Sequence, residues 1–303
     1  MIVDIPNTTI PKVGKKVLEL RDSGGVVALG RVLTLIIETD PDHLETAVAA
    51  ANGASRLHPS RIVVLVGQPN SPESKLDAQI RVGGDAGASE VIILNVHGKA
   101  TSNAESLVTG LLLPDAPVVA WWPANSPSAP SRTEVGEIAS RRITDSSLQP
   151  DPREFLVELA KNYSPGDGDM AWTRITLWRA QLAALFEQHL QRKVVGITVY
   201  GSASSPSADL LGMWLQQRLG VAAKFERELD GKTISGISGV TLSFDDGTLE
   251  ILRAGQVAQI KQVGAPESSV LLPQRSDQDC LVEDMRFLGE DEVYGSVLKG
   301  FLG

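Results

Sequence analysis

The chain has 303 residues, of which 42% are hydrophobic and 21% are charged, and its formal net charge is -9 at pH 7. This length can form two domains with their own cores, and the composition is that of a folded globular protein. Because an acidic chain disfavours non-specific contact with nucleic-acid phosphates and anionic lipid, neither nucleic acid nor membrane is expected as a partner.

The N-terminal residues and the apolar runs carry no recognisable targeting or spanning segment. Residues 1–16 contain an acidic residue and two prolines where a signal peptide needs a basic patch and an apolar run. The apolar run that starts at Val26 is broken by Arg31 and is too short to cross a bilayer. Cys280 is the only cysteine, which excludes an internal disulfide. These features predict a cytoplasmic protein.

Strands that alternate with helices are predicted along the first half of the chain. Apolar or alternating runs predict strands at 26–39, 61–67, 77–82 and 90–96, and one that ends at Pro123. Helices are predicted at 41–54, 104–113 and 153–162. This alternation is typical of an α/β domain built on a mainly parallel sheet.

A cluster of turn formers, YSPGDGD at residues 163–169, marks the predicted domain boundary. It divides the chain into an N-terminal α/β domain, 1–163, and a C-terminal domain, 164–303. A single long helix is predicted from Asp169 to about His189, with the Asp169 carboxylate as its N-cap.

The second half begins as α/β and then changes character. A strand is predicted at 194–201 and a helix at 207–219. Two segments, 225–236 and 240–254, each place Asp-Gly between alternating runs, which predicts antiparallel hairpins. Helices at 277–288 and 291–302 are predicted to close this mixed α+β arrangement.

Motifs for common enzyme chemistry are missing from the sequence. No P-loop and no G-x-S-x-G nucleophile elbow occurs. The histidines are far apart and show no metal-ligand spacing; they are His43, His58, His97 and His189. The sequence therefore predicts no catalytic residues, no metal site and no cofactor.

One basic cluster has two open interpretations. Arg56, His58 and Arg61 lie within six residues, and Arg31 lies on the preceding predicted strand. Together these four side chains form a candidate anion site. The alternative is a helix C-terminus whose cations complement the helix dipole before a proline turn.

The consecutive residues Trp121 and Trp122 end a predicted strand and must point to opposite faces of the sheet. One can join the core, while the other faces a covering helix, a cleft or a partner. Pro123 ends the strand at the edge where ligand crevices open in parallel sheets.

The segment after the predicted boundary concentrates tryptophan and arginine: Trp172, Arg174, Trp178 and Arg179. The two tryptophans follow the spacing of a buried helical stripe, and Arg179 lies at its edge, where it can stack on tryptophan. Two interpretations stay open, an inter-domain helix that fills core and a partner-facing patch, because tryptophan and arginine dominate interface energetics.

Three segments, RLHPSRIVVLV, DAPVVAWWP and DMAWTRITLWRAQLAALFE, resemble in order and spacing the bacterial glucose-6-phosphate dehydrogenase assembly proteins of the OpcA family. The resemblance implies a non-catalytic allosteric activator that binds glucose-6-phosphate dehydrogenase, promotes its active oligomer and supports the pentose phosphate pathway. It nominates the four tryptophans above with Arg174 and Arg179, and supplies no catalytic residue. Some relatives respond to thiol redox state, but Cys280 alone cannot make the internal disulfide of such a switch.

An alternative of a different class is a sugar-phosphate-binding sensor or enzyme that uses the basic cluster of Arg31, Arg56, His58 and Arg61. A third possibility is a scaffold that binds the dehydrogenase without a kinetic effect.

Overall fold

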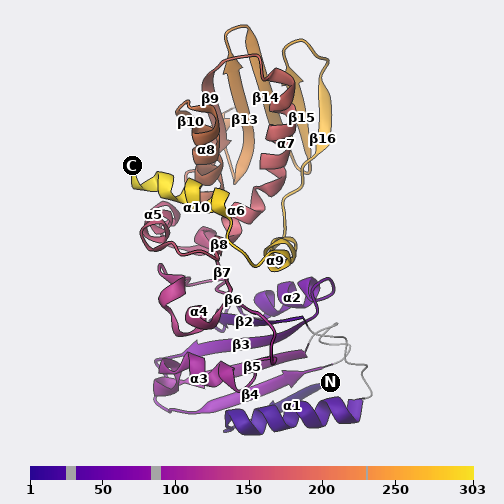
Figure 1. Ribbon diagram of the computed structural model, residues 1–303, viewed down its shortest axis with the longest axis vertical. Helices are drawn as coiled ribbons and strands as arrows, with labels where there is room; N and C mark the ends of the chain where they lie inside the picture. The colour runs from indigo at the N-terminus through magenta and orange to yellow at the C-terminus, as the bar shows by residue number, and fades with distance from the viewer. Residues whose placement is uncertain (25–31, 83–89, 230) are drawn as a thin grey trace. The chain divides into compact units, whose positions relative to one another are not determined.

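The computed structural model describes residues 1–24, 32–82, 90–229 and 231–303, and these form two compact units (Figure 1). The first unit comprises Met1–Leu148, Tyr163–Gly168 and Ser276–Asp291. The second comprises Gln149–Asn162, Asp169–Arg275 and Glu292–Gly303. The sequence-based boundary between residues 163 and 164 stays a prediction. Among the described helices, none is both long and apolar enough to cross a membrane.

The first unit is built on an eight-stranded sheet in the order β1-β4-β5-β3-β2-β6-β7-β8. Neighbours from β5 through β3, β2 and β6 to β7 pair in parallel, whereas β1 pairs with β4 and β4 with β5 in the antiparallel sense. The strands are β1 (Ile2–Ile5), β2 (Leu33–Thr39), β3 (Ser60–Gln68), β4 (Leu76–Arg81), β5 (Glu90–His97), β6 (Val118–Trp121), β7 (Arg141–Thr144) and β8 (Asp167–Asp169). The predicted mainly parallel sheet is confirmed.

Helices cover this sheet, which explains why its central strands are apolar along their whole length. Residues of α1, α3 and α4 join alternate residues of the strands in one core, and α2 packs against β2, β3 and α9 (Figure 1). The helices are α1 (Ile10–Gly24), α2 (Leu44–Ala54), α3 (Ala104–Thr109), α4 (Glu134–Ile138) and α9 (Asp277–Arg286), with 3-10 turns η2 (Gly98–Ser102), η3 (Pro130–Arg132) and η4 (Ser146–Leu148).

Several elements of the first unit differ from the sequence prediction. Strand β1 and helix α1 were not predicted, because Pro6 and Pro11 resemble loop residues; Pro11 instead occupies the first turn of α1, where a backbone N–H is not needed. The helix predicted at 104–113 ends at Thr109. Of the strand predicted at 26–39, residues 26–31 lie outside the described residues.

The second unit contains a six-stranded sheet in the order β10-β9-β13-β14-β15-β16 and a separate hairpin. Strands β9 and β10 pair in parallel, and the others are antiparallel, as predicted for an α/β start followed by a meander. The strands are β9 (Val194–Gly201), β10 (Ala223–Glu226), β11 (Glu228–Leu229), β12 (Lys232–Thr233), β13 (Ile237–Phe244), β14 (Gly247–Ala254), β15 (Val257–Gln262) and β16 (Ser268–Leu271).

The helices of the second unit are α5 (Pro152–Asn162), α6 (Met170–Arg174), α7 (Thr176–Phe186), α8 (Pro206–Leu219) and α10 (Glu292–Lys299), with η5 (Glu187–His189) and η6 (Gly300–Leu302). Helix α8 packs against β9 and β10 and also contacts α5, α6 and α10. The predicted hairpin at 240–254 is confirmed as β13 and β14, whose register joins Phe244 to Gly247.

The helix predicted as continuous from Asp169 to His189 is divided at Ile175. The Ile175 backbone has φ -94° and ψ 6°, and its N–H bonds to the carbonyl of Trp172 three residues earlier. The β-branched residues Thr173, Ile175 and Thr176 cluster at this point and favour a helix less than unbranched residues do. The N-cap is confirmed, since the Asp169 carboxylate accepts a bond from the Ala171 N–H at 2.8 Å.

Candidate functional site

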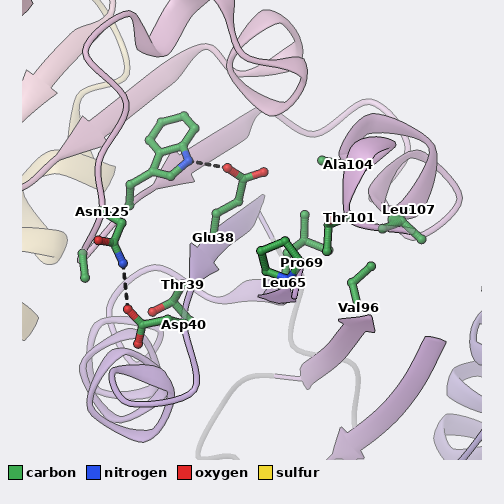
Figure 2. A pocket seen from close by; sticks show the side chains of 13 residues that line it. Glu38, Thr39, Asp40, Leu65, Pro69, Val96, Thr101, Ala104, Leu107 and Asn125 are labelled. Carbon is green, nitrogen blue, oxygen red and sulfur yellow. Dashed lines mark hydrogen bonds between the residues drawn. The ribbon is translucent and has the colours of Figure 1, made fainter. Parts of the chain in front are cut away.

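The carboxyl ends of four parallel strands and the segments that follow them surround a pocket of about 330 Å³ in the first unit. Strand β2 contributes Glu38 and Thr39, and the segment after β6 contributes Trp122 and Asn125. Apolar side chains complete the opposite wall, where Figure 2 shows Leu65, Val96 and Leu107. The site therefore lies at the edge of the sheet that was expected from the position of Pro123.

The pairing of β2 with β6 places Glu38 beside Trp122. In this parallel register, Thr34 aligns with Val118 and Ile37 with Trp121, a constant offset of 84 residues. Glu38 and Trp122 continue the same offset, and the indole Nε1 of Trp122 donates a hydrogen bond to the Glu38 carboxylate (Figure 2). The strand pairing thus fixes this contact.

The Glu38 carboxyl has a pKa above its ordinary value of 4.5. Burial is the main cause, because it disfavours the charged form, and repulsion from the carboxylate of Glu134 adds to it. The hydrogen bond from Trp122 acts in the opposite direction. Glu38 is therefore a half-buried acid whose described hydrogen-bond donor is an uncharged ring.

The loop after β6 is held in place by polar contacts. The Asn125 amide donates to the Asp40 carboxylate at 2.8 Å, with the Asn125 backbone in the left-handed region at φ 51°. The Ser126 hydroxyl donates to the Trp122 carbonyl at 2.9 Å and accepts the Asp145 N–H at 3.0 Å. This wall of the pocket is therefore pre-organised by its own hydrogen bonds.

Two further polar groups lie at the β2 end of the pocket. The pKa of Asp40 lies below its ordinary value. Partial burial raises this pKa, but the hydrogen bonds from His43 favour the charged form and lower the pKa by more. The Thr39 side chain lines the pocket and is 9% exposed, and its hydroxyl oxygen is buried without a hydrogen-bond partner. A buried hydroxyl in that state is uncommon in folded proteins.

The neighbouring Trp121 points to the other face of the sheet, as its position in the strand predicts. Trp122 belongs to the core cluster that contains Val118 and Ala120, and Trp121 does not. Both indoles are buried, at 1% exposure for Trp121 and 3% for Trp122. Of the two, Trp122 is therefore the one that lines a cleft.

In the second unit, Trp172 and Trp178 are both 2% exposed and fill core. The Arg179 guanidinium lies 3.7 Å from the centre of the Trp172 ring, which confirms that an arginine at the edge of the stripe can stack on tryptophan. The Arg253 guanidinium lies 5.4 Å from the Trp178 ring. Arg174 is half-buried at the end of α6. Whether these residues form a partner surface stays a prediction.

The described residues of the candidate anion site have different surroundings. Arg61 is buried and donates to the Glu90 carboxylate at 2.8 Å and to the Leu111 carbonyl at 2.6 Å. Arg21 binds the same carboxylate. Arg56 is exposed and His58 half-buried, while Arg31 lies outside the described residues. The Arg61 charge is thus already matched inside the fold, and the anion site stays a prediction.

The sequence did not single out Glu38, Asp40 or Asn125 as site residues. The available signal was Trp122-Pro123 at the end of one parallel strand and Thr39-Asp40 at the end of another, since such ends share an edge. Within the described part of the chain, no group of three or more His, Cys, Asp and Glu side chains could hold a metal ion.

The chain is similar to a solved structure and to a curated protein. The crystal structure of biliverdin reductase in complex with biliverdin and NADP+ from Synechocystis aligns with a TM-score of 0.43 and 10% sequence identity. The alignment covers 89% of this chain and 96% of that one. A Synechocystis protein named as the OxPP cycle protein OpcA is 31% identical over 115 residues. That match covers 35% of this chain and 23% of the relative, so it spans less than a quarter of the relative's length.

Two family models match adjacent parts of the chain. One, described as the N-terminal domain of the glucose-6-phosphate dehydrogenase subunit, matches residues 51–161. The other, described as the C-terminal domain of that subunit, matches residues 165–298. Together they cover most of the sequence and confirm the resemblance carried by its tryptophan-rich segments. The chain belongs to the OpcA family of glucose-6-phosphate dehydrogenase assembly proteins.

Proposed function

We propose that this protein binds glucose-6-phosphate dehydrogenase in the cytoplasm and activates it by stabilising its substrate-competent oligomer. The observation that carries the proposal is the pair of family matches, which together extend from residue 51 to residue 298. Through the dehydrogenase, the protein would support the oxidative pentose phosphate pathway.

Activation of this kind requires no chemistry by the activator. A protein that binds one state of an enzyme more tightly than another shifts the population toward that state. A coupling free energy of about 1–3 kcal/mol corresponds to roughly a 5–150-fold change in affinity. The ionic contact of Arg61 with Glu90 supports this interpretation over catalysis, because it engages a candidate site residue within the fold.

The segment formed by α6 and α7 is the part of the chain that we propose for the partner surface. Its tryptophans are buried, but Leu177 is 37% exposed on α7, and Arg174 and Arg179 are half-buried on either side in sequence. Arginine is enriched in protein interfaces, and Leu177 adds exposed apolar area between the two arginines in sequence.

The test is to titrate the protein into purified glucose-6-phosphate dehydrogenase while measuring KM for glucose 6-phosphate, kcat and the mass of the oligomer. We expect a saturable change in KM or kcat together with a larger oligomer. If micromolar protein alters none of these quantities, the proposed function is wrong for this pair.

A pair of variants tests the surface separately from the function. Leu177→Asp should weaken activation at least tenfold in half-maximal concentration, whereas Leu57→Asp, at a leucine that is 69% exposed, should leave it unchanged. Equal activation by both variants would reject the α6–α7 surface and leave the assembly role standing.

The sugar-phosphate alternative is separated by calorimetry with glucose 6-phosphate on the protein alone. We expect no binding, because Glu90 already engages Arg61. Tight binding that Arg61→Ala abolishes would favour a sensor, and multiple turnovers of any sugar ester by the purified protein would favour an enzyme.

A further inference from the structure

The pocket between β2 and β6 lies where the winding of the parallel sheet changes direction. From β2 the chain continues to β3 and then β5 on one side, and it returns to β6 and β7 on the other side. In open α/β sheets, ligands bind outside the carboxyl ends of the strands at this switch point. Glu38 and Thr39 at the end of β2, and Trp122 and Asn125 after β6, are the residues that line the pocket here.

The chemistry of the turn after β2 is the opposite of a phosphate cradle. Sites for dinucleotides place glycines at this turn, so that backbone N–H groups can approach the pyrophosphate. This chain has Glu38-Thr39-Asp40-Pro41-Asp42 instead, with three carboxylates in five residues. Their charge would repel a phosphate, so the switch point does not select a nucleotide.

Among the described residues, the Glu38 carboxylate of this pocket has an uncharged hydrogen-bond donor and no ion-pair partner. The half-buried Glu38 carboxylate receives a bond from the uncharged Trp122 indole, and the charged neighbour that acts on it is another carboxylate, Glu134. A carboxylate that is partly removed from water is stabilised by a neighbouring positive charge.

The rest of the lining suits an aliphatic chain. Leu65, Val96 and Leu107 form the wall that faces the carboxylates (Figure 2). A volume of about 330 Å³ is at the lower end of the range for small-molecule sites. The site therefore combines an acidic end with an apolar wall.

We propose that this pocket binds a small organic cation, an alkylammonium or alkylguanidinium compound, with its charged group at Glu38. The alkyl part lies along Leu65, Val96 and Leu107. The ligand supplies a positive charge beside Glu38 and donates a hydrogen bond to its carboxylate. This proposal does not depend on any contact with glucose-6-phosphate dehydrogenase.

The binding test uses n-butylammonium and n-butylguanidinium chloride as probes on the full chain, with butanol and butyrate as neutral and anionic controls. Binding is followed at constant ionic strength by calorimetry and by tryptophan fluorescence. We expect saturable binding of at least one of the two cations, and binding of butanol and butyrate at least tenfold weaker. Equal response to cation and butanol, or no saturable cation binding, would overturn the proposal.

Variants assign the binding to this pocket. Glu38→Gln removes the charge while its amide oxygen can still accept the Trp122 hydrogen bond, and it should weaken cation binding at least tenfold. Glu154→Gln makes the same change on the exposed surface of α5 and should have no effect. If Glu38→Gln binds the cation as tightly as the unaltered chain does, the site is not this pocket.

A steric variant gives an answer that does not depend on charge. Gly67 lines the pocket on β3, and a side-chain β-carbon placed there would meet no atom within 4 Å. Gly67→Leu should therefore fill the space and abolish cation binding, while Gly67→Ala should retain most of it. Both variants should unfold at or above the temperature of the unaltered chain, since glycine is unfavourable in strands. Undiminished binding in a folded Gly67→Leu variant would contradict the proposal.

Discussion

The indole nitrogen of Trp122 donates a hydrogen bond to the carboxylate of Glu38, and the parallel register of β2 and β6 brings these two residues together. The contact gives Trp122 a polar role in addition to its place in the core. It also means that the free energy of folding is linked to the protonation of Glu38, since the surroundings of this carboxyl differ between the folded and unfolded chain.

Glu38→Gln should change how stability depends on pH. The folded pKa of Glu38 is raised above 4.5, so the folded state binds this proton more tightly than the unfolded state does. The unaltered chain should lose stability as pH rises from 4.5 through the folded pKa, and Glu38→Gln should lack that loss. Urea melts at several pH values measure the difference between the two. A difference that is constant across pH would contradict the prediction, and Glu154→Gln is the control at an exposed site.

Trp178→Ala should cost about 3–5 kcal/mol of folding free energy, because it removes a large buried side chain and leaves a cavity. Arg179→Ala should cost less, about 0.5–2 kcal/mol, since it removes a cation that stacks on Trp172. Denaturant melts of both variants compare the two costs. An unchanged melt for Trp178→Ala would show that this indole does not pack in the folded protein.

Glu90→Gln should destabilise the first unit by about 3 kcal/mol or more, because it leaves the buried Arg61 and the half-buried Arg21 without their shared carboxylate. The exposed pair of Arg81 with Glu45 offers a matched comparison, and Glu45→Gln should cost less than about 1 kcal/mol. Thermal or urea melts decide this. Equal costs for the two variants would mean that the burial of Glu90 adds nothing.

A fragment that ends at residue 163 should fold poorly, because it lacks α9. That helix buries Cys280, Leu281 and Met285, and its Asp284 forms a buried ion pair at 2.5 Å with Arg141 of β7. A shortened chain in which a flexible linker joins residues 1–168 to 276–291 should recover a cooperative melt. If fragment 1–163 alone melts at the same temperature as this linked form, α9 contributes nothing to the first unit, and the predicted boundary is adequate.

The sequence predicted those elements whose apolar pattern is local. Strands β2, β3 and β5 were predicted from their continuous apolar runs, and β13 from the alternation of Val240, Leu242 and Phe244. Each pattern involves only residues that are neighbours in the sequence. The break at Ile175 was not predicted. The β-branched residues there have only a slightly lower helix propensity than unbranched ones, whereas the apolar spacing on both sides favours one continuous helix.

The candidate site was only partly predictable. Trp122 and Pro123 indicated the correct edge of the sheet, because strand ends are visible in the sequence. Glu38, the hydrogen-bond partner of Trp122, was not predictable, because the contact depends on which strands are neighbours and on their register. The residues around Glu38 do not show that β2 pairs with a strand 84 residues later in the sequence. The same holds for Arg61, whose neighbour Glu90 belongs to another strand.

The grouping of Ser276–Asp291 with the first unit has a consequence for protein synthesis. Translation proceeds at about 5–20 residues per second, so roughly 7–29 s separate the emergence of Leu148 from that of Asp291. Throughout that interval, the nascent first unit lacks α9, and the surfaces of α2 and β7 that contact this helix are uncovered. A chaperone that binds apolar surface would have its longest opportunity there, and a ribosome stalled before α9 would display an incomplete sheet domain to the quality-control proteases.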